Sequence, residues 1–238
     1  MHFLITNDDG VHAPGIAAMA DAVSLIPGAT FTIVAPSSER SQCGHSLTTH
    51  HLLTTVQESD NRYHTSGTPA DCVRIGLFAL GIRPDFVLSG VNAGGNMGQD
   101  IPISGTLAGA REAAYHGVPA IAVSHYLISG IALDWPRVAR WTAQLLGELI
   151  TQPLADGELW NVNLPHLPPG ERELPERITT TPCRLPLNVA YEEVMVDDTS
   201  PGHRRLKYTA RYADRPVQPG SDVEACFGGR ISVSRLKL

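Results

Sequence analysis

The chain has 238 residues, of which 42% are apolar and 18% charged, and this composition indicates a folded globular protein, not a disordered or fibrous one. Its formal net charge is −6 and its longest basic run is the pair Arg204 and Arg205, so the positive surface expected of a protein that binds a nucleic-acid backbone is missing. The length allows one large α/β domain, or one domain with a smaller lobe, around a substantial core.

The cysteines and the N-terminus exclude several further classes. The four cysteines lie far apart and form no Cys-x-x-Cys pair, so neither a zinc ribbon nor a dithiol redox motif is indicated, and we expect reduced, mostly buried thiols. The N-terminus lacks the basic-then-apolar order of a signal peptide, and no apolar stretch approaches the roughly 20 residues that span a bilayer. These patterns predict a cytoplasmic protein that does not enter a membrane.

The first 80 residues predict strands and helices in alternation. An apolar strand over 2–6 ends abruptly in Asn-Asp-Asp-Gly, a helix over 14–26 begins with Pro14, and a second strand covers 31–35. Residues 47–56 and 62–65 have the pattern of two strands of a hairpin arm, about 46–66. A further helix starts at Thr68, which can cap it, with Pro69 in the first helical position.

The alternation continues beyond residue 85. Strands are predicted over 85–89, 120–124 and 159–163, and helices over 106–116 and 135–150, with an unusually glycine-rich loop over 90–104. This succession predicts a Rossmann-like, three-layer α/β fold with a mostly parallel sheet. Beyond Pro165 prolines, charges and short alternating runs such as 204–212 dominate, so we predict a catalytic domain over 1–165 and a β-rich C-terminal part over 166–238.

The turn after the first strand carries two adjacent carboxylates, Asp8 and Asp9. In an open parallel sheet, ligands collect outside the carboxyl ends of the strands. Adjacent carboxylates repel unless a cation or hydrogen-bond donors neutralise them, and hard cations such as Mg²⁺ or Mn²⁺ prefer oxygen ligands. The pair therefore indicates a metal site, although an ordinary turn with one solvated and one capping Asp is an equally good interpretation of this loop alone.

The glycine-rich loop is the second half of the predicted site. Asn92, Asn96 and Ser104 supply neutral oxygens, and the glycines between them let the backbone approach a ligand closely. Residues 104–106 lead into a helix whose free N–H groups could hold a phosphate, with Ser104, Gly105 and Thr106 as donors. The alternative is that Ser104 or Thr106 simply caps the helix.

Other catalytic motifs are weak or missing. The ten histidines form no His-x-x-x-His pair, so a zinc site is not indicated. His45, in the polar loop after the second strand, could donate a proton to a leaving group, or could be a solvated loop histidine. The chain has no Gly-x-Ser-x-Gly elbow and no dinucleotide-binding glycine fingerprint.

Several blocks of the sequence resemble the SurE survival proteins, a family of metal-dependent nucleotidases. The resemblance rests on Thr6-Asn-Asp-Asp-Gly-Val-His-Ala-Pro-Gly15, Val34-Ala-Pro36, Arg40-Ser41, Gly67-Thr-Pro-Ala-Asp-Cys-Val73, Ser89-Gly-Val-Asn-Ala-Gly94, Asn96 and Ser104-Gly-Thr106, with weaker similarity at 160–165, 220–222 and 231–232. Ile103 departs from the family, which often has an aromatic or polar residue before Ser-Gly-Thr.

The resemblance implies a site and an activity. One divalent cation, Mg²⁺ or Mn²⁺, would be bound by Asp8, Asp9, Ser41 and Asn92, and the phosphate would lie among Asn96, Ser104, Gly105 and Thr106. The family hydrolyses nucleoside 5′- and 3′-monophosphates, with some activity on polyphosphate, and forms dimers or tetramers through C-terminal segments. By resemblance, residues 166–238 would then serve oligomerisation.

These inferences combine into one mechanism with two competing hypotheses. A water would attack the phosphorus in line with metal assistance, Asp8 or Asp9 would orient that water, and His45 or solvent would protonate the departing oxygen. An aspartyl-phosphate route through Asp8 is an open alternative. The competing functions are a regulatory module that binds a nucleotide or phosphate without turnover, and a dinucleotide oxidoreductase, which the missing glycine fingerprint disfavours.

Overall fold

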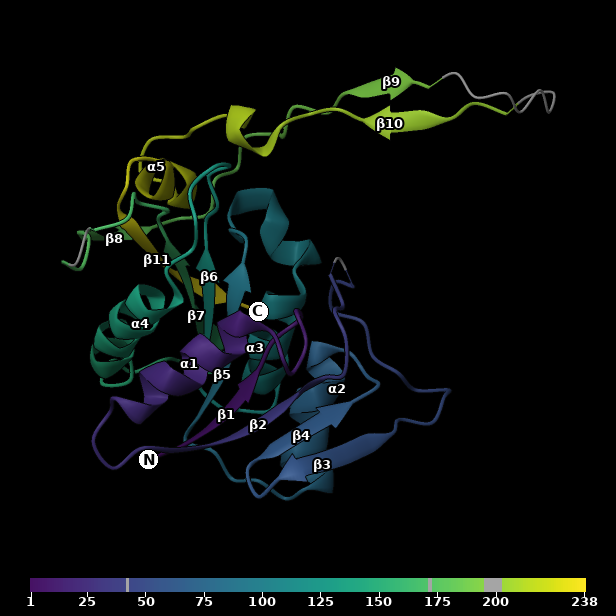
Figure 1. Cartoon of the computed structure of the whole chain (residues 1–238), viewed down its shortest axis with the longest axis vertical. Coiled ribbons are helices and arrows are strands. Elements are labelled where there is room, and N and C mark those ends of the chain that lie inside the picture. Colours follow the sequence, from purple (N-terminus) through teal and green to yellow (C-terminus); the bar gives the residue numbers. More distant parts are fainter. Residues whose placement is uncertain (42, 171–172, 195–202) are drawn as a thin grey trace.

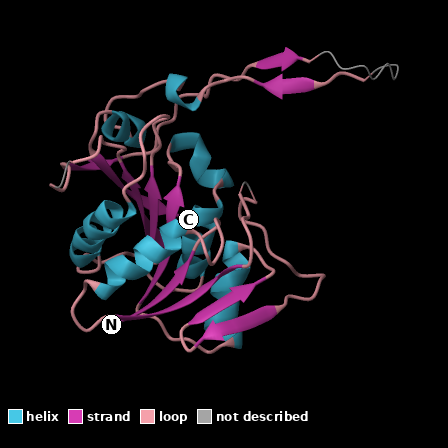
Figure 2. Cartoon of the chain, viewed as in Figure 1, coloured by secondary structure: helices cyan, strands magenta, loops and turns pink. Residues whose placement is uncertain are grey.

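A computed structural model describes residues 1–41, 43–170, 173–194 and 203–238. Within these ranges nine strands form one twisted sheet in the order β3-β4-β2-β1-β5-β6-β7-β11-β8, flanked by helices (Figures 1 and 2). The strands of this sheet are β1 His2–Thr6, β2 Thr30–Pro36, β3 Thr55–Ser59, β4 Arg62–Thr65, β5 Phe86–Ala93, β6 Ala120–His125, β7 Glu158–Leu164, β8 Arg177–Thr180 and β11 Ile231–Lys237.

The centre of the sheet is parallel, which confirms the predicted fold class. Strand β1 pairs in parallel with β2 on one side and with β5 on the other, so that Ile5 lies between Ile33 and Leu88. Strands β5, β6 and β7 continue the parallel run, whereas β3–β4 and β7–β11 are antiparallel. The central strands are almost fully buried, as expected for a parallel sheet covered on both faces.

Helices cover the two faces in pairs and complete the three layers. Helices α1 (Pro14–Ser24) and α4 (Trp135–Leu149) share one apolar cluster with Phe3 and Ile5, and α2 (Pro69–Arg74) and α3 (Gly105–Tyr115) share another with Leu4. Because successive side chains of a strand point to opposite faces, this alternation along β1 places the two helix pairs on opposite sides of the sheet.

Helix ends follow the signals in the sequence. Pro14 begins α1, and Thr68 caps α2 in a capping box: its hydroxyl accepts from Asp71 N at 3.1 Å, while Asp71 Oδ2 accepts from Thr68 N at 2.9 Å. After Arg74 the helix widens into a π turn over Ile75–Ala79. These observations confirm the predicted starts of both helices.

The prediction of a strand over 47–56 was wrong. Strand β3 covers Thr55–Ser59, and residues 47–54 run irregularly beside the start of α2. Thr48 donates through its N–H and its hydroxyl to the Asp71 carboxylate, at 3.0 and 2.7 Å. These side-chain hydrogen bonds offer the backbone an alternative to a strand ladder, which a pattern of apolar alternation does not reveal.

The main sheet continues across the predicted boundary at residue 165. Strand β11 lies between β7 and β8, and helix α5 (Asp222–Phe227) precedes it. A separate antiparallel hairpin of β9 (Tyr191–Glu193) and β10 (Leu206–Tyr208) projects away from the body of the molecule (Figure 1).

All four cysteines are free, and Cys72, Cys183 and Cys226 are buried, as predicted. No helix in the described ranges is long and apolar enough to cross a membrane.

Candidate active site

The two predicted loops meet where the connections change sides of the sheet. Strands β1 and β5 are neighbours, with Thr6 opposite Ser89 near their carboxyl ends. The chain leaves β1 for α1 on one face, and it leaves β5 for α3 on the opposite face. Such a topological switch point opens a crevice at the ends of the strands, where α/β proteins bind their ligands.

The loop after β1 is closed by its own side chain. Asn7 Nδ2 donates to Gly10 O at 2.9 Å and Asn7 Oδ1 accepts from Gly10 N at 3.2 Å, while Gly10 has a φ of +104°. Asn7 thus has a structural role, and this tight turn presents Asp8 and Asp9 at the crevice. The main-chain oxygen of Asp8 also accepts from Arg40 N at 2.7 Å, which brings the backbone around Arg40 against it.

Asp8 lies at the first turn of α3. It is only 6% exposed, and its Oδ1 accepts a 2.6 Å hydrogen bond from Thr106 Oγ1. A Cβ on Gly105 would stand 2.8 Å from Asp8 Oδ2, so only glycine leaves room for the carboxylate there. Burial raises the pKa of Asp8 from 3.8 to about 6; the Thr106 hydrogen bond opposes this shift and the Asp9 charge adds to it.

Asp9 stands beside Asp8 and is half-buried. Its Oδ2 accepts from Ala93 N at 3.4 Å, which links it to the end of β5. Burial raises the pKa of Asp9, the Ala93 hydrogen bond lowers it, and the charge of Glu39 raises it. Neither Asp8 nor Asp9 forms an ion pair with a described residue, so two adjacent carboxylates lack a compensating charge.

The donor set here suits a hard divalent cation. Among the described residues no three His, Cys, Asp or Glu side chains come together as a metal site. The ligands beyond Asp8 and Asp9 would therefore have to be neutral oxygens, which Mg²⁺ and Mn²⁺ accept. The structure brings Asn92 near this place: it is the penultimate residue of β5, next to Ala93, whose N–H contacts Asp9.

The end of β5 needs its glycines. Gly90 has a φ of +128°, and a Cβ there would stand 2.2 Å from Val123 O, at the irregularity in the pairing of β5 with β6. Asn92 Nδ2 donates to Gly94 O at 2.8 Å, which fixes the amide and leaves its carbonyl oxygen as the group available to a cation. Ser41 is exposed instead, and its hydroxyl donates to Glu39 Oε1 at 2.5 Å.

The start of α3 combines the two alternatives that the sequence left open. Ser104 Oγ accepts from Leu107 N at 3.1 Å and so caps the helix, while the Thr106 hydroxyl is committed to Asp8. The helix nevertheless directs its positive end at the end of β1, where Gly105 lets the Asp8 carboxylate pack against the first turn. An anion bound here would meet main-chain N–H groups more than hydroxyl donors.

Asn96 is held from strand β7, a contact that sequence reasoning missed. Asn96 N donates to Asn163 Oδ1 at 2.8 Å, and Asn96 O accepts from Asn161 Nδ2 and Asn163 Nδ2 at 3.0 and 3.1 Å. Its side-chain Nδ2 donates to Ser124 Oγ at 2.8 Å and lies 3.5 Å from Thr106 Oγ1. Two asparagines on one face of a buried strand were the available signal.

His45 turns away from the Asp8 region. Its Nε2 lies 2.6 Å from Glu112 Oε2, and its ring is 5.8 Å from that of Tyr115. Glu112 is seven residues, about 10 Å at the α-helical rise, beyond Gly105 along α3. Arg74 and His116 bind the same carboxylate. Burial raises the pKa of Glu112, but hydrogen bonds from His45, Arg74 and His116 outweigh it and lower the pKa to about 2.

Fold and site together define an α/β protein with an acidic, oxygen-rich cluster of side chains beside a helix N-terminus. Comparison with known proteins specifies the family. The family model described as "Survival protein SurE" matches residues 3–184. The chain belongs to the SurE family, which confirms the resemblance noted in its sequence.

Relatives cover the whole chain. A protein of a Nostoc species, described as a candidate 5′-nucleotidase, is 45% identical over the full length of both chains. A 5′-nucleotidase SurE of Geobacter sulfurreducens is 41% identical and covers 100% of this chain and 88% of the relative. The crystal structure of the SurE protein of Aquifex aeolicus aligns with a TM-score of 0.86 at 30% identity, over 100% of this chain and 93% of that one.

Proposed function

We propose that this protein is a metal-dependent nucleotidase, a phosphomonoester hydrolase that converts nucleoside 5′-monophosphates, and also 3′-monophosphates, into nucleoside and phosphate. One observation carries the proposal: the buried Asp8 carboxylate, beside Asp9 and without a cationic partner among the described residues, lies at the positive end of α3. Relatives described as 5′-nucleotidases support this substrate class.

Four residues would hold the cation, namely Asp8, Asp9, Asn92 and Ser41. Asp8 and Asp9 are adjacent, Asn92 precedes Ala93, whose N–H contacts Asp9, and Ser41 would need to exchange Glu39 for the cation. When bound, a divalent cation neutralises charge on the phosphoryl group and makes a water more acidic. The two carboxylates supply the negative charge that this cation requires, and the start of α3 supplies main-chain N–H groups for the phosphate.

The chain itself orients the reactants. Asp8 is fixed by Thr106, so its second oxygen is the group placed to orient an attacking water. Charge on the equatorial oxygens of the phosphoryl group would be stabilised by the N–H groups at the start of α3, from Ser104 to Thr106. Asn96 would support this helix start from behind. His45 can act as the acid only after its ring leaves Glu112. Its neighbour Gly44 already lies near Ile103, beside the start of α3.

We propose that the projecting hairpin serves a homodimer or homotetramer. Tyr191, Tyr208 and Leu206 are each at least half exposed there, and the two tyrosine rings pack edge to face at 5.5 Å. Exposed apolar side chains gathered on a projecting arm are typical of an association surface. Sedimentation of the chain with and without Tyr191→Ser and Tyr208→Ser would test this role.

A panel of metals and substrates tests the proposed activity. We expect turnover of nucleoside monophosphates with Mg²⁺ or Mn²⁺, its loss on exhaustive chelation, and its recovery when metal is restored. Asp8→Asn and Asn92→Asp should each lower kcat/KM at least about a thousandfold. The matched control, Asp21→Asn on the exposed side of α1, should change it less than about twofold.

The same panel separates the competing function. A regulatory module would bind nucleotide or phosphate but show no turnover with any metal. Full activity after complete metal removal would instead overturn the metal mechanism, whichever way the variants behave.

A further inference from the structure

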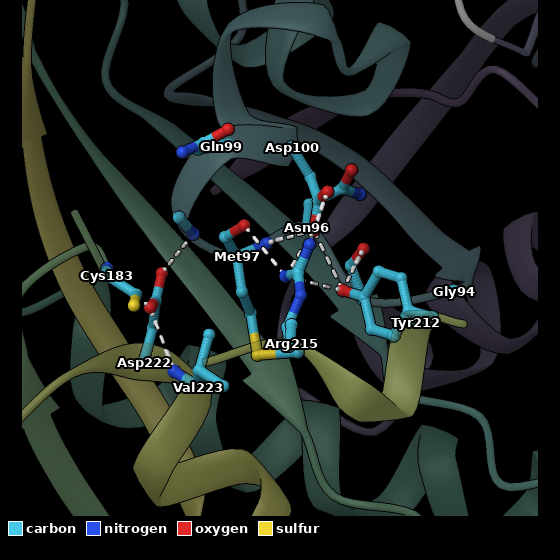
Figure 3. A network of polar contacts seen from close by, with 12 residues as sticks. Gly94, Asn96, Met97, Gln99, Asp100, Cys183, Tyr212, Arg215, Asp222 and Val223 are labelled. Atoms are coloured by element: carbon cyan, nitrogen blue, oxygen red, sulfur yellow. Dashed lines mark hydrogen bonds and ion pairs between the residues drawn. The ribbon is translucent and has the colours of Figure 1, made fainter. Parts of the chain in front are cut away.

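A buried ion pair joins the loop after β5 to the distant segment 203–238. Figure 3 shows Arg215 reaching Asp100, with Nη1 2.8 Å from Oδ2 and Nη2 2.9 Å from Oδ1. The Arg215 side chain is only 3% exposed. A buried, bidentate pair of this kind has a narrow geometry, and leaving either partner alone is costly, so it fixes the position of Asp100 strongly.

Tyr212 strengthens the same attachment. Its hydroxyl lies 2.8 Å from Asp100 Oδ2 and 3.2 Å from Gly95 O, and the Arg215 guanidinium covers its ring at 4.1 Å. A Cβ on Gly95 would stand 3.1 Å from this hydroxyl and 2.8 Å from Met97 Cε. The glycine therefore permits the close approach of Tyr212 to the loop.

These contacts flank Asn96 along the chain. Tyr212 binds the carbonyl of Gly95, and Arg215 Nη1 donates to the carbonyl of Met97 at 3.2 Å (Figure 3). The main chain of Asn96 is itself hydrogen-bonded to the two asparagines of β7, as described above. With both neighbours fixed by one segment and its own backbone fixed by another, Asn96 has little freedom to move.

The segment has a second attachment to the loop. Asp222 Oδ2 accepts from Gly98 N at 2.8 Å, and its Oδ1 accepts from Cys183 N at 2.8 Å (Figure 3). A Cβ on Gly98 would stand 2.8 Å from Cys183 O, so glycine is again required where the segments touch. Residues 95–100 are thus bound by side chains that follow them by more than 110 positions.

We propose that Arg215 and Tyr212 are positioning residues for the phosphate site, acting through Asn96. Asn96 contacts Ser124 and Thr106, and Thr106 donates to Asp8. The chain of contacts that begins at Arg215 therefore reaches the start of α3, where the proposed function places the phosphate. The inference rests on that proposal. A merely structural ion pair would stabilise the fold without altering phosphate affinity.

The test measures inorganic phosphate binding to the Mn²⁺-loaded protein by calorimetry, which needs no turnover. Tyr212→Phe and Arg215→Met should weaken phosphate binding about threefold and about tenfold, and Arg215→Lys should recover part of the loss because it keeps the charge. Circular dichroism at the assay temperature confirms that each variant is folded. In the pair Arg215→Met with Asn96→Ala, the losses should be less than additive in phosphate affinity.

Arg137 offers a matched control. It is similarly buried, donates to the carbonyls of Leu167 and Pro168, and lies over the Trp141 ring at 4.9 Å, and these partners lie outside residues 95–100. Arg137→Met should lower the melting temperature without changing phosphate affinity. Arg215 variants that lose stability alone, or losses that add fully to that of Asn96→Ala, would overturn the inference.

The two proposals fail differently. A wild-type chain that binds phosphate but turns over no nucleotide would overturn the nucleotidase proposal while the binding comparison still decides the role of Arg215. A wild-type chain that binds no phosphate in the presence of Mn²⁺ would overturn both.

Discussion

The loop after β1 and the loop after β5 meet at the same end of the sheet, but different parts of the chain hold them. Residues 7–10 close on themselves through Asn7, whereas residues 94–104 depend on β7 and on the segment 203–238. The first loop therefore brings its geometry with its own sequence. The second acquires its geometry only when distant segments have packed, and this makes it the part of the site that remote substitutions can loosen.

The largest expected effect tests the self-contained loop through pH. The folded pKa of Asp8, about 6, lies above its ordinary 3.8, so its favourable contribution to stability is fully present below pH 3.8 and is lost as pH rises through 6. In metal-free protein the stability lost in this way amounts to about 3 kcal/mol at pH 7.5. Asp8→Asn should be more stable than wild type by about this amount at pH 7.5, and about equal to it at pH 4.

Chemical denaturation at both pH values, with metal chelated, provides the measurement. Equal stabilities of the two proteins at pH 7.5 would mean that the Asp8 carboxylate is compensated without metal.

A smaller effect is expected at the seam between the loop after β1 and α3. Gly105→Ala places a Cβ 2.8 Å from Asp8 Cβ and Oδ2, so either the carboxylate or the helix must shift. We expect kcat/KM to fall about thirtyfold, through a displaced ligand. Gly147→Ala, in α4 with nothing within 4 Å of the added Cβ, should instead stabilise the fold by about 0.5–1 kcal/mol. Steady-state kinetics and thermal melting of both variants distinguish the loss of activity at Gly105 from the gain of stability at Gly147.

The smallest effect should arise in the loop that depends on remote support. Asn163→Ala removes two hydrogen bonds to the main chain of Asn96 and leaves the buried Asn96 N–H unpaired, while Asn96 O keeps its bond from Asn161. The free energy of unfolding should fall by about 1–3 kcal/mol and KM should rise about tenfold. The exposed Asn61→Ala is the control, and a KM unchanged by Asn163→Ala would show that Asn96 needs no support from β7.

Sequence reasoning succeeded where the determinants are local. Apolar runs ending in turn residues located the central strands, and Thr68 with Pro69 located a helix start that the capping box confirms. The sequence placed Asp8 after one predicted strand and Asn92 after another, and β1 and β5 are neighbours in the sheet. That these residues bind a metal stays a prediction.

Sequence reasoning failed where the determinants are long-range. The pairs Asn96–Asn163 and Asp100–Arg215 are separated by 67 and 115 residues, and nothing in the local pattern links them. The side chain of His45 could be placed in its loop, but its direction is set by Glu112, Arg74 and His116. Ser104 Oγ accepts from Leu107 N and so caps α3, and its role as a phosphate donor stays a prediction.

The position of β11 between β7 and β8 also constrains the order of events during synthesis. Strand β8 pairs with β11 alone in the sheet, in parallel register from Arg177 opposite Ile231 to Thr180 opposite Ser234. A nascent chain that has emerged only to residue 220 has a complete β1–β7 sheet but no ladder for β8 to join. The turn at Asp8 can therefore form early on the ribosome, while the supports of the second loop arrive later, Asn163 with β7 and Arg215 and Asp222 only near the end of synthesis.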